Sequence, residues 1–458
     1  MLRLSQQSDQ QTWRALVLRQ NGTEVLLAGG GPRFALPAIT IPRGRRVAKE
    51  MVQAMKTDWG CEAICVSMPG ASFPASNGET VSYQLLEFWN DTNTNSDRAE
   101  WVPVAYLSRD YFQDAQDYCA LQQSLAESAE CAVSSSGPFA RLGWFKELRA
   151  WVAGTIGLQG LKLQRSFCQW NASPTFGLIR FETSGLAVWF KAVGEPNVRE
   201  LPITSELARL CPDSIPQIIA VRRKWNAWLA WEAEGTTLGE SGHIEHWKSA
   251  ATALADIQIA TCGHSSNLIR SGARDLRLSV VSNLVHPFLG IVAELMDQQP
   301  KFPPQILNRH ELRYLEDQIK RTLASAGDLR IPDSVGHLDL NPGNIIVSAH
   351  SCVLVDWAEA YVGFPFLSFE YLLEHFRQTN AEPEREAELI DSYWRPWTLS
   401  IPADRLSAAK DCAPLLAVFA YATQSPGWEK HETNAGTASY LRSLTRRMKR
   451  EADRLPVH

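Results

Sequence analysis

The sequence predicts an α+β fold with more than one part, on three observations. Short apolar segments with strand-like alternation surround one amphipathic helix in the first 125 residues. A second group of such segments lies between residues 139 and 235, and longer helical patterns fill the rest. A Ser- and Gly-containing stretch, Glu127–Gly137, stands between the two groups of strands and is typical of a linker.

Composition narrows the class of protein. Hydrophobic residues make up 45% of the 458 residues and charged residues 21%, as in folded globular chains. The net charge of −5 comes without a basic stripe, so we expect no nucleic-acid partner. We also expect a cytoplasmic protein without a membrane partner, because the N-terminus has no apolar signal region and apolar stretches such as Ala413–Ala422 are short. The oligomeric state is left open.

The sequence pattern of the first part of the chain predicts strands around one helix. Trp13–Arg19 and Glu24–Ala28 alternate on either side of an Asn-Gly turn, which is typical of a hairpin. Arg46–Trp59 has an apolar helical face and is followed by Gly60, a residue suited to end a helix. Further strands are expected at Ile64–Met68 and Val81–Trp89.

This order, with Leu36-Pro37 before the helix, resembles the Nudix hydrolase fold. The family's metal-binding helix carries several Glu before a closing Gly. With Gly60 as that Gly, the matching positions hold Gln53, Ala54, Thr57 and Asp58. One carboxylate cannot replace the cluster that a hard divalent cation needs. The resemblance therefore implies a Nudix-like domain over residues 1–125 without hydrolase chemistry.

The segment from residue 335 to 360 holds the residues best suited to catalysis. His337, Asp339 and Asn344 lie in a loop that contains Pro and Gly. Two short apolar strands follow, and Asp356 stands at the end of the second. Because the strands form a hairpin, we expect Asp339, Asn344 and Asp356 at one edge. Two carboxylates and an amide oxygen suit Mg²⁺ bound with a nucleotide.

Asp339 and Asn344 have the D-x-x-x-x-N spacing of a kinase catalytic loop. With Asp356-Trp357 after the strand, the segment resembles the aminoglycoside phosphotransferase and choline kinase superfamily. Leu338 replaces the family's commoner small residue. The resemblance implies ATP or GTP and Mg²⁺ as cofactors, with Asp339 catalytic and Asn344 and Asp356 as metal ligands. It gives His337 a structural role in the loop.

A kinase-like fold also needs a small lobe before this loop. Phe176–Glu182 and Ala187–Ala192 predict a hairpin, and Lys191 ends its second strand. By the resemblance, Lys191 binds the nucleotide phosphates and pairs with a Glu of the next helix, Arg199–Leu210. Glu200 is the preferred partner, and Glu206 is the alternative.

Another hairpin follows and leads into the predicted adenine-binding hinge. Its strands are Ile215–Val221 and Ala227–Trp231, and the resemblance places the hinge at Glu232, Ala233 and Glu234, where backbone groups would bind adenine. The loop over the phosphates is expected between Phe167 and Phe176, without a Gly-rich motif. Helices are then expected at His246–Ala260, Glu311–Ala324, Tyr371–Phe376 and Glu386–Trp394.

Together these expectations give a two-lobed protein-kinase-like fold after a small α+β domain. The expected parts are residues 1–125, a linker at 126–138, an N-lobe at 139–235 and a helical C-lobe at 236–458. The resemblance implies phosphotransfer from ATP or GTP to a hydroxyl of a small molecule. Two alternatives stay open: a catalytically weak nucleotide-binding pseudokinase or scaffold, and a Nudix-type hydrolase. The acceptor stays unidentified, since most acidic residues after the hairpin look like a solvated helix face.

Overall fold

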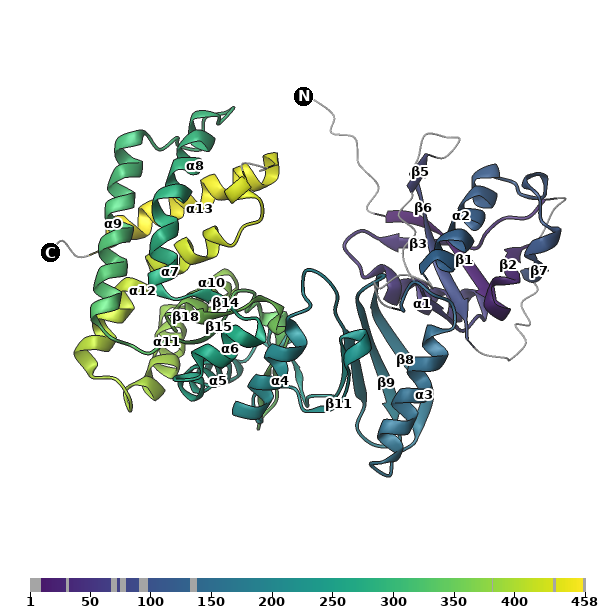
Figure 1. Ribbon diagram of the computed structural model, residues 1–458, viewed down its shortest axis with the longest axis horizontal. Coiled ribbons are helices and arrows are strands. Elements are labelled where there is room, and N and C mark those ends of the chain that lie inside the picture. The colour runs from purple at the N-terminus through teal and green to yellow at the C-terminus, as the bar shows by residue number, and fades with distance from the viewer. Residues whose placement is uncertain are drawn as a thin grey trace. The chain divides into compact units, whose positions relative to one another are not determined.

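The computed structural model of the protein describes residues 10–29, 33–66, 72–74, 80–89, 98–131, 138–380, 382–430 and 434–455. The chain forms two compact units (Figure 1). Unit 1 comprises Met1–Leu201 and Ile218–Glu232, and unit 2 comprises Pro202–Gln217 and Ala233–His458. The expected α+β class is confirmed.

The first sheet of unit 1 has seven strands in the described residues, in the order β4-β6-β1-β2-β7, with β3 on β1 and β5 on β6. The expected hairpin and helix are confirmed, and the helix ends at Gly60 with φ 59°. Such a left-handed end favours glycine because it has no Cβ. The elements are β1 Gln10–Arg19, β2 Glu24–Ala28, β3 Ala38–Pro42, α1 Val47–Trp59, β4 Ala63–Cys65, β5 Ser72–Pro74, β6 Thr80–Phe88, β7 Ala99–Pro103 and α2 Ala115–Cys131.

The second sheet of unit 1 is antiparallel, in the order β11-β12-β10-β9-β8. Both expected hairpins are present. Helix α3 packs on this sheet through its buried side chains, among them Phe145, whose ring lies 4.8 Å from Phe167 of β8. The elements are α3 Trp144–Gly157, β8 Leu163–Ala172, β9 Gly177–Thr183, β10 Val188–Ala192, β11 Ile218–Arg222 and β12 Ala227–Trp231. Helix α4, Glu200–Leu210, begins in unit 1 and belongs to unit 2 from Pro202 onward.

One hydrophobic core joins the two sheets of unit 1. It runs from Leu16 and Val25 in the first sheet, through Phe145 of α3, to Phe190 and Leu229 in the second. In the sequence that separates the two sheets, α2 extends to Cys131 and so includes the start of the segment expected as a linker. Residues 132–137 lie outside the described part. The proposed boundaries of the N-terminal domain stay a prediction.

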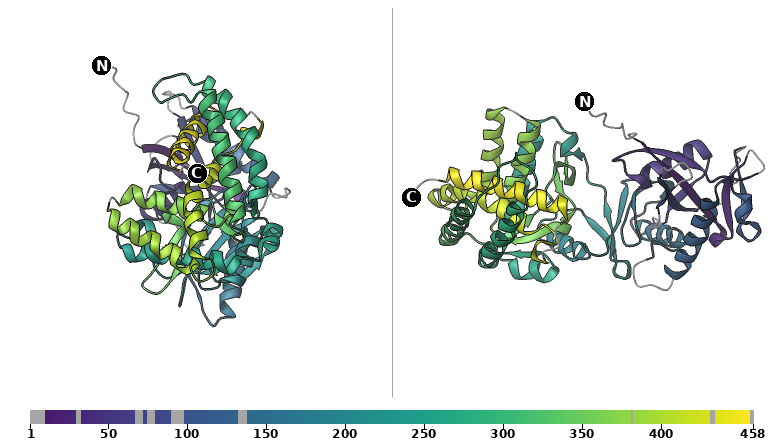
Figure 2. Two further views of the ribbon diagram at one scale, coloured as in Figure 1. Left: turned by 90° about the vertical axis from the view of Figure 1, so that its left-hand side faces the viewer. Right: turned by 90° about the horizontal axis from the view of Figure 1, so that it is seen from above.

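Unit 2 is mainly helical and carries two small sheets, β13-β16-β17 and β14-β18-β15. The four helices expected here are confirmed, each longer than its sequence pattern indicated. Helices α8, α9, α12 and α13 pack together in the region that runs from green to yellow in Figure 2. The bounds are β13 Thr236–Thr237, α5 Ile244–Thr261, α6 Ser265–Ser271, β14 Arg274–Leu276, α7 Leu278–Val281, α8 Val285–Asp297, α9 Arg309–Asp328, β15 Ser334–His337, β16 Ile345–Val347, β17 Cys352–Leu354, β18 Ala360–Gly363, α10 Leu367–Thr379, α11 Pro383–Trp397, α12 Ala403–Thr423 and α13 Ala435–Arg454.

One helical stretch, Leu278–Asp297, has the length and apolar composition of a membrane span. Its side chains Val285, Phe288, Val292 and Met296 are buried in the core of unit 2. Core helices of folded proteins show the same composition. The stretch is also interrupted, because a 3₁₀ turn separates α7 from α8.

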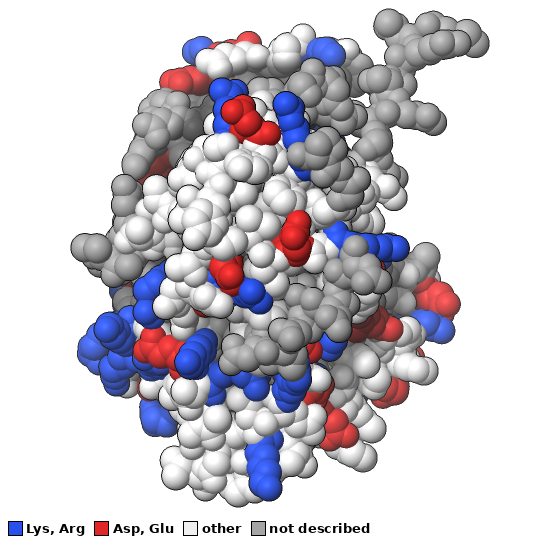
Figure 3. All heavy atoms as spheres, turned by 90° about the vertical axis from the view of Figure 1, so that its right-hand side faces the viewer, with Lys and Arg blue, Asp and Glu red and all other residues white. Residues whose placement is uncertain are grey.

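The charged side chains are mixed in sign on the face drawn in Figure 3. Lys and Arg gather in its lower half, with Asp and Glu among them.

Candidate functional site

The loop after β15 is built around a buried histidine. The Nδ1 atom of His337 accepts a hydrogen bond from the backbone N–H of Asp339 (3.1 Å), and Nε2 lies 3.2 Å from the carbonyl oxygen of Val355. An imidazole that accepts at Nδ1 donates at Nε2, so the neutral ring joins the loop to the following hairpin. The ring also lies 4.8 Å from the ring of Trp357. These contacts fit a structural part for His337.

Asp339 faces two amide side chains of the same loop. Asn341 donates to Asp339 Oδ1 at 3.0 Å, and Asn344 donates to the Asp339 carbonyl at 2.9 Å and to Oδ2 at 3.3 Å. Asn341 also accepts from the backbone of Gly343 and so begins the 3₁₀ turn Pro342–Asn344. The carboxylate is therefore held in place by donors and stays partly exposed. Sequence reasoning missed Asn341, which occupies an unspecified position of the motif.

The hairpin β16–β17 brings Asp356 next to this loop. Ile345 pairs with Leu354, and the N–H of Val355 donates to the carbonyl of Asn344 at 2.9 Å. Asp356 follows with φ 65° and ψ 55°, a left-handed conformation that a non-glycine residue adopts at a cost of about 1–3 kcal/mol. Residues held in such conformations cluster at functional sites. The structure thus brings Asp339, Asn344 and Asp356 to one edge, as expected.

The oxygen atoms at this edge fit a magnesium ion that is bound together with phosphates. The Nδ2 atom of Asn344 donates to Asp339, which leaves its Oδ1 as the atom that could bind a cation. No cluster of three or more His, Cys, Asp or Glu with metal-site spacing occurs among the described residues. Mg²⁺ does not require one, since it is commonly bound by one or two carboxylates with water and substrate phosphates.

In unit 1, a buried ion pair joins the second sheet to α4. Lys191 Nζ lies 2.5 Å from Glu200 Oε1, and the side chains are 14% and 2% exposed. Lys191 also lies 5.8 Å from the ring centre of Trp228 on β12. The alternative partner, Glu206, binds Arg209 instead, at 2.7 Å. The structure therefore selects the preferred pairing of the two.

In the predicted hinge, the carboxylate and the backbone N–H of Glu232 already have hydrogen-bond partners. The carboxylate of Glu232 binds Arg180 through two hydrogen bonds of 2.5 and 2.8 Å, and this contact lowers the pKa of Glu232. Its backbone N–H donates to Ala187. Ala233 is half-buried and Glu234 is exposed. The next residue, Gly235, has φ 124°, and a Cβ there would lie 2.0 Å from the carbonyl oxygen of Val347, so the chain requires glycine.

The expected phosphate loop is shorter than the sequence suggested. Residues 167–172 belong to strand β8, so only Ser173–Phe176 form a turn, and the prediction of a loop from Phe167 was wrong for most of its length. The strand forms there because Gln169 and its neighbours bond to distant parts of unit 1, which a local pattern does not reveal.

A cavity of about 280 Å³ lies beside the catalytic loop, among β15, α10, α12 and α13. Its wall includes Tyr371 and Tyr421, whose rings stack at 5.4 Å, and His375, whose ring lies 4.8 Å from Tyr371. Burial lowers the pKa of His375, while the Asp339 and Glu374 carboxylates act in the opposite direction. The cavity is therefore within electrostatic reach of Asp339.

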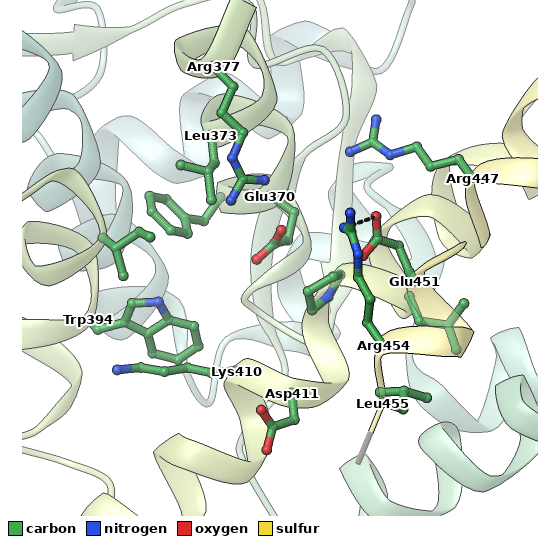
Figure 4. A pocket seen from close by; sticks show the side chains of 14 residues that line it. Glu370, Leu373, Arg377, Trp394, Lys410, Asp411, Arg447, Glu451, Arg454 and Leu455 are labelled. Carbon is green, nitrogen blue, oxygen red and sulfur yellow. Dashed lines mark hydrogen bonds and ion pairs between the residues drawn. The ribbon is translucent and has the colours of Figure 1, made fainter. Parts of the chain in front are cut away.

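A second cavity of about 400 Å³ lies among α10, α11, α12 and α13 (Figure 4). Glu370 and Arg447 line both cavities. Burial raises the pKa of Glu370 to about 7. Arg447 binds Glu374 at 3.0 Å, and Arg454 binds Glu451 at 3.1 Å. Two of the acidic residues after the hairpin, Glu370 and Glu374, thus line cavities rather than a fully solvated helix face.

Comparison with known families agrees with this geometry. Residues 208–399 match the model of the phosphotransferase enzyme family. The resemblance found in the sequence is confirmed over this region, which contains the catalytic-loop residues Asp339, Asn344 and Asp356. Lys191 and Glu200 precede it. No curated protein matches the chain.

Solved structures similar to the chain cover residues of both units at low identity. A macrolide 2′-phosphotransferase from Brachybacterium faecium is 14% identical, with 64% of this chain and 96% of that chain covered and a TM-score of 0.41. A choline kinase from Streptococcus pneumoniae is 13% identical, with 66% and 99% covered and a TM-score of 0.41. A choline kinase from Cryptosporidium parvum is 11% identical, with 64% and 90% covered and a TM-score of 0.44.

Proposed function

We propose that the protein transfers the γ-phosphoryl group of ATP or GTP to a hydroxyl group of a small molecule. The observation that carries the proposal is the arrangement of Asp339, Asn344 and Asp356 on one loop and hairpin. Two further observations support the proposal. Residues 208–399 match the model of the phosphotransferase enzyme family, and Lys191 forms a buried ion pair with Glu200.

In this proposal the residues of the chain position the reactants and balance charge. Asp339 orients the acceptor hydroxyl and takes its proton as the new oxygen–phosphorus bond forms and the bond from the γ-phosphorus to the departing nucleoside diphosphate breaks. Asn341 and Asn344 donate to its carboxylate and hold it in place. Asn344 and Asp356 would hold Mg²⁺, which would neutralise the charge on the transferred phosphoryl group. Lys191, oriented by Glu200, binds the nucleotide phosphates.

The cavity beside the catalytic loop is the proposed acceptor site. Its wall includes His337 and Leu338, which directly precede Asp339, together with tyrosine rings and the polar groups Glu374 and Arg447. Its volume of about 280 Å³ suits a small molecule rather than a protein chain.

The test is phosphoryl transfer by the purified full chain. The protein would be incubated with Mg²⁺ and either ATP or GTP, together with a panel of amino alcohols, sugars and aminoglycosides. Phosphorus NMR would detect a new phosphate ester, and Asp339→Asn is the matched inactive variant. A phosphate ester formed equally by both proteins, or wild-type protein that binds neither nucleotide, would contradict the proposal.

A further inference from the structure

Strand β8 is bound to the N-terminal part of unit 1 at several residues between Arg165 and Asn171, and α1 lies beside it in Figure 1. Near its start, Arg165 binds Glu62 at 2.7 Å. Gln169 binds β4 in its middle, and Asn171 binds Arg46 near its end. An edge strand of a sheet has an unpaired side, and here side chains of the preceding part of the chain occupy it.

Gln169 joins the two sheets of unit 1. Its buried side-chain amide accepts from the N–H of Cys65 at 2.8 Å and donates to the carbonyl of Cys65 at 2.9 Å. Cys65 belongs to β4, which is an edge of the first sheet. The amide of Gln169 therefore pairs with this edge as the backbone of another strand would. Buried polar groups satisfied in this way fix the geometry of both partners.

The next residue interrupts the pairing of β8 with β9. Gln169 pairs with Ile179 and Asn171 with Leu178, so Trp170 is an extra residue in a β-bulge. Two cations from the start of α1 lie over the Trp170 ring, Lys49 at 4.3 Å and Arg46 at 5.2 Å. Arg46 also donates to Asn171 at 2.9 Å. A β-bulge bends its strand and so changes the direction of the residues that follow. The cations at the start of α1 therefore contact β8 at the point where its direction changes.

The end of β8 leads directly into the Ser173–Phe176 turn, and β9, which follows it, pairs with the strand that carries Lys191. The Ser173–Phe176 turn is closed by the Ser173 N–H to the Phe176 carbonyl (3.0 Å) and by the Phe176 N–H to Ser173 Oγ (2.9 Å). Thr175 packs against Gly194, where an added Cβ would lie only 2.2 Å from Thr175 Cβ. Across the sheet, Asn171 pairs with Leu178, and Leu178 pairs with Lys191.

We propose that α1 and β4 set the position of the Ser173–Phe176 turn and of Lys191, and so set the nucleotide affinity. Arg46, Lys49 and Gln169 are then positioning residues for the phosphates, although none of them belongs to the turn. The inference rests on the proposed function, in which Lys191 binds the nucleotide phosphates, and on the expectation from the sequence that the loop before β9 covers them. It gives the N-terminal part of unit 1 a role that needs no hydrolase chemistry.

The test uses the full chain with exposed residues at the start of α1 changed, namely Arg46 just before the helix and Lys49 in its first turn. Arg46→Ala/Lys49→Ala removes both cations from the Trp170 ring, and Arg43→Ala/Arg45→Ala removes the same charge from the segment just before α1. Arg43 and Arg45 are exposed and make no side-chain hydrogen bond or ion pair in the described part of the chain. Calorimetry would measure the Kd of Mg·ATP for the wild type and both variants.

We expect the first variant to raise the Kd of Mg·ATP about five- to tenfold, and the second to leave it unchanged. With a working acceptor, the KM for the nucleotide should rise while the KM for the acceptor stays constant. Gln169→Ala should also accelerate hydrogen exchange at the Phe176 amide. Because Gln169 is buried, this substitution can prevent folding. In that case the Mg·ATP affinity of Arg46→Ala/Lys49→Ala alone decides whether the inference holds.

The outcomes separate the inference from the function on which it rests. Equal Mg·ATP affinity for the wild type and Arg46→Ala/Lys49→Ala overturns the positioning role and leaves the phosphotransferase proposal standing. An equal loss in both double variants shows a general charge effect and also overturns it. Wild-type protein without Mg·ATP affinity overturns the proposed function, and the positioning role with it.

Discussion

Glu87 on β6 gives unit 1 a stability that depends on pH. Its Oε1 accepts from the N–H of Gly143, just before α3, at 2.7 Å, while Oε2 is buried without a hydrogen bond in the described part of the chain. Burial raises the pKa of Glu87 to about 7 from an ordinary value of 4.5, against the effects of the Gly143 N–H and of Arg141. We predict that Glu87→Gln stabilises the protein at high pH.

The magnitude follows from the difference between these two pKa values. Between pH 4.5 and 7 the folded protein keeps a proton that the unfolded chain has released, so folding stability falls as pH rises through this range. One pKa unit is worth 1.36 kcal/mol, which gives about 3 kcal/mol of stability lost above pH 7. Gln keeps the acceptor for Gly143 and does not titrate. The stability of the variant relative to the wild type should therefore grow by about 2–3 kcal/mol between pH 5 and pH 8.

Native-state hydrogen exchange at the amides of β1 and β6 measures the stability of the sheet that contains Glu87. A local measurement is needed because a chain of two units need not unfold in one step. The exposed Glu100 on β7 of the same sheet provides the control, as Glu100→Gln. A difference between Glu87→Gln and wild type that is the same at pH 5 and pH 8 would refute the buried-carboxyl account. If the stability of Glu100→Gln relative to the wild type rose by the same amount between pH 5 and pH 8, that result would refute the account as well.

Three further predictions concern the proposed metal site, the buried ion pair and the N-terminal part. Asp356→Ala should abolish Mg²⁺-dependent nucleotide binding with the fold intact, and unchanged Mg·ATP affinity by calorimetry would remove Asp356 from the metal site. Glu200→Gln takes the carboxylate from the mostly buried Lys191, so it should destabilise unit 1 by about 3–5 kcal/mol and weaken nucleotide binding; an unaltered melting temperature and affinity would argue against this. The full chain carrying Asp339→Asn should not hydrolyse nucleoside-diphosphate derivatives with Mg²⁺, because Asp58 alone cannot form the metal cluster; any Mg²⁺-dependent hydrolysis would show otherwise.

The candidate site was predictable where its residues are close in sequence. Asp339, Asn344 and Asp356 are joined by one loop and one hairpin, so local spacing places them together. The sequence left both Glu200 and Glu206 open as partners of Lys191, and only the folded chain shows that Glu200 binds Lys191 while Glu206 binds Arg209. Asn341 escaped notice because the motif does not specify its position.

Features that depend on distant parts of the chain were not predictable from local patterns. Strand β8 continues past Phe167 because Gln169 finds its partners in Cys65, more than one hundred residues earlier. The shared core of the two sheets likewise joins Leu16 to Leu229. Helix α3 is a different case, since its buried Leu148, Val152 and Ile156 recur at helical spacing and the pattern was present to be found.

The two cavities of unit 2 also needed the folded structure. Glu370 and Glu374 stand among other acidic residues and resemble a solvated helix face in the sequence. Packing of α10 against α12 and α13 places them in cavities instead, where burial raises the pKa of Glu370 to about 7. Helix periodicity shows which side chains share a face, but not which neighbouring helix encloses that face.

The most direct test of the phosphotransferase account compares the wild type with Asp339→Asn in transfer of the γ-phosphoryl group from Mg·ATP, to an acceptor alcohol or to water. The account predicts a rate about 10²–10⁴-fold lower for the variant, which is the usual contribution of a general base. It also predicts nearly unchanged Mg·ATP affinity, since Asn keeps the shape of the loop and the metal is assigned to Asn344 and Asp356. Equal rates for the two proteins, or a wild type that binds Mg·ATP no better than Asp356→Ala does, would contradict it.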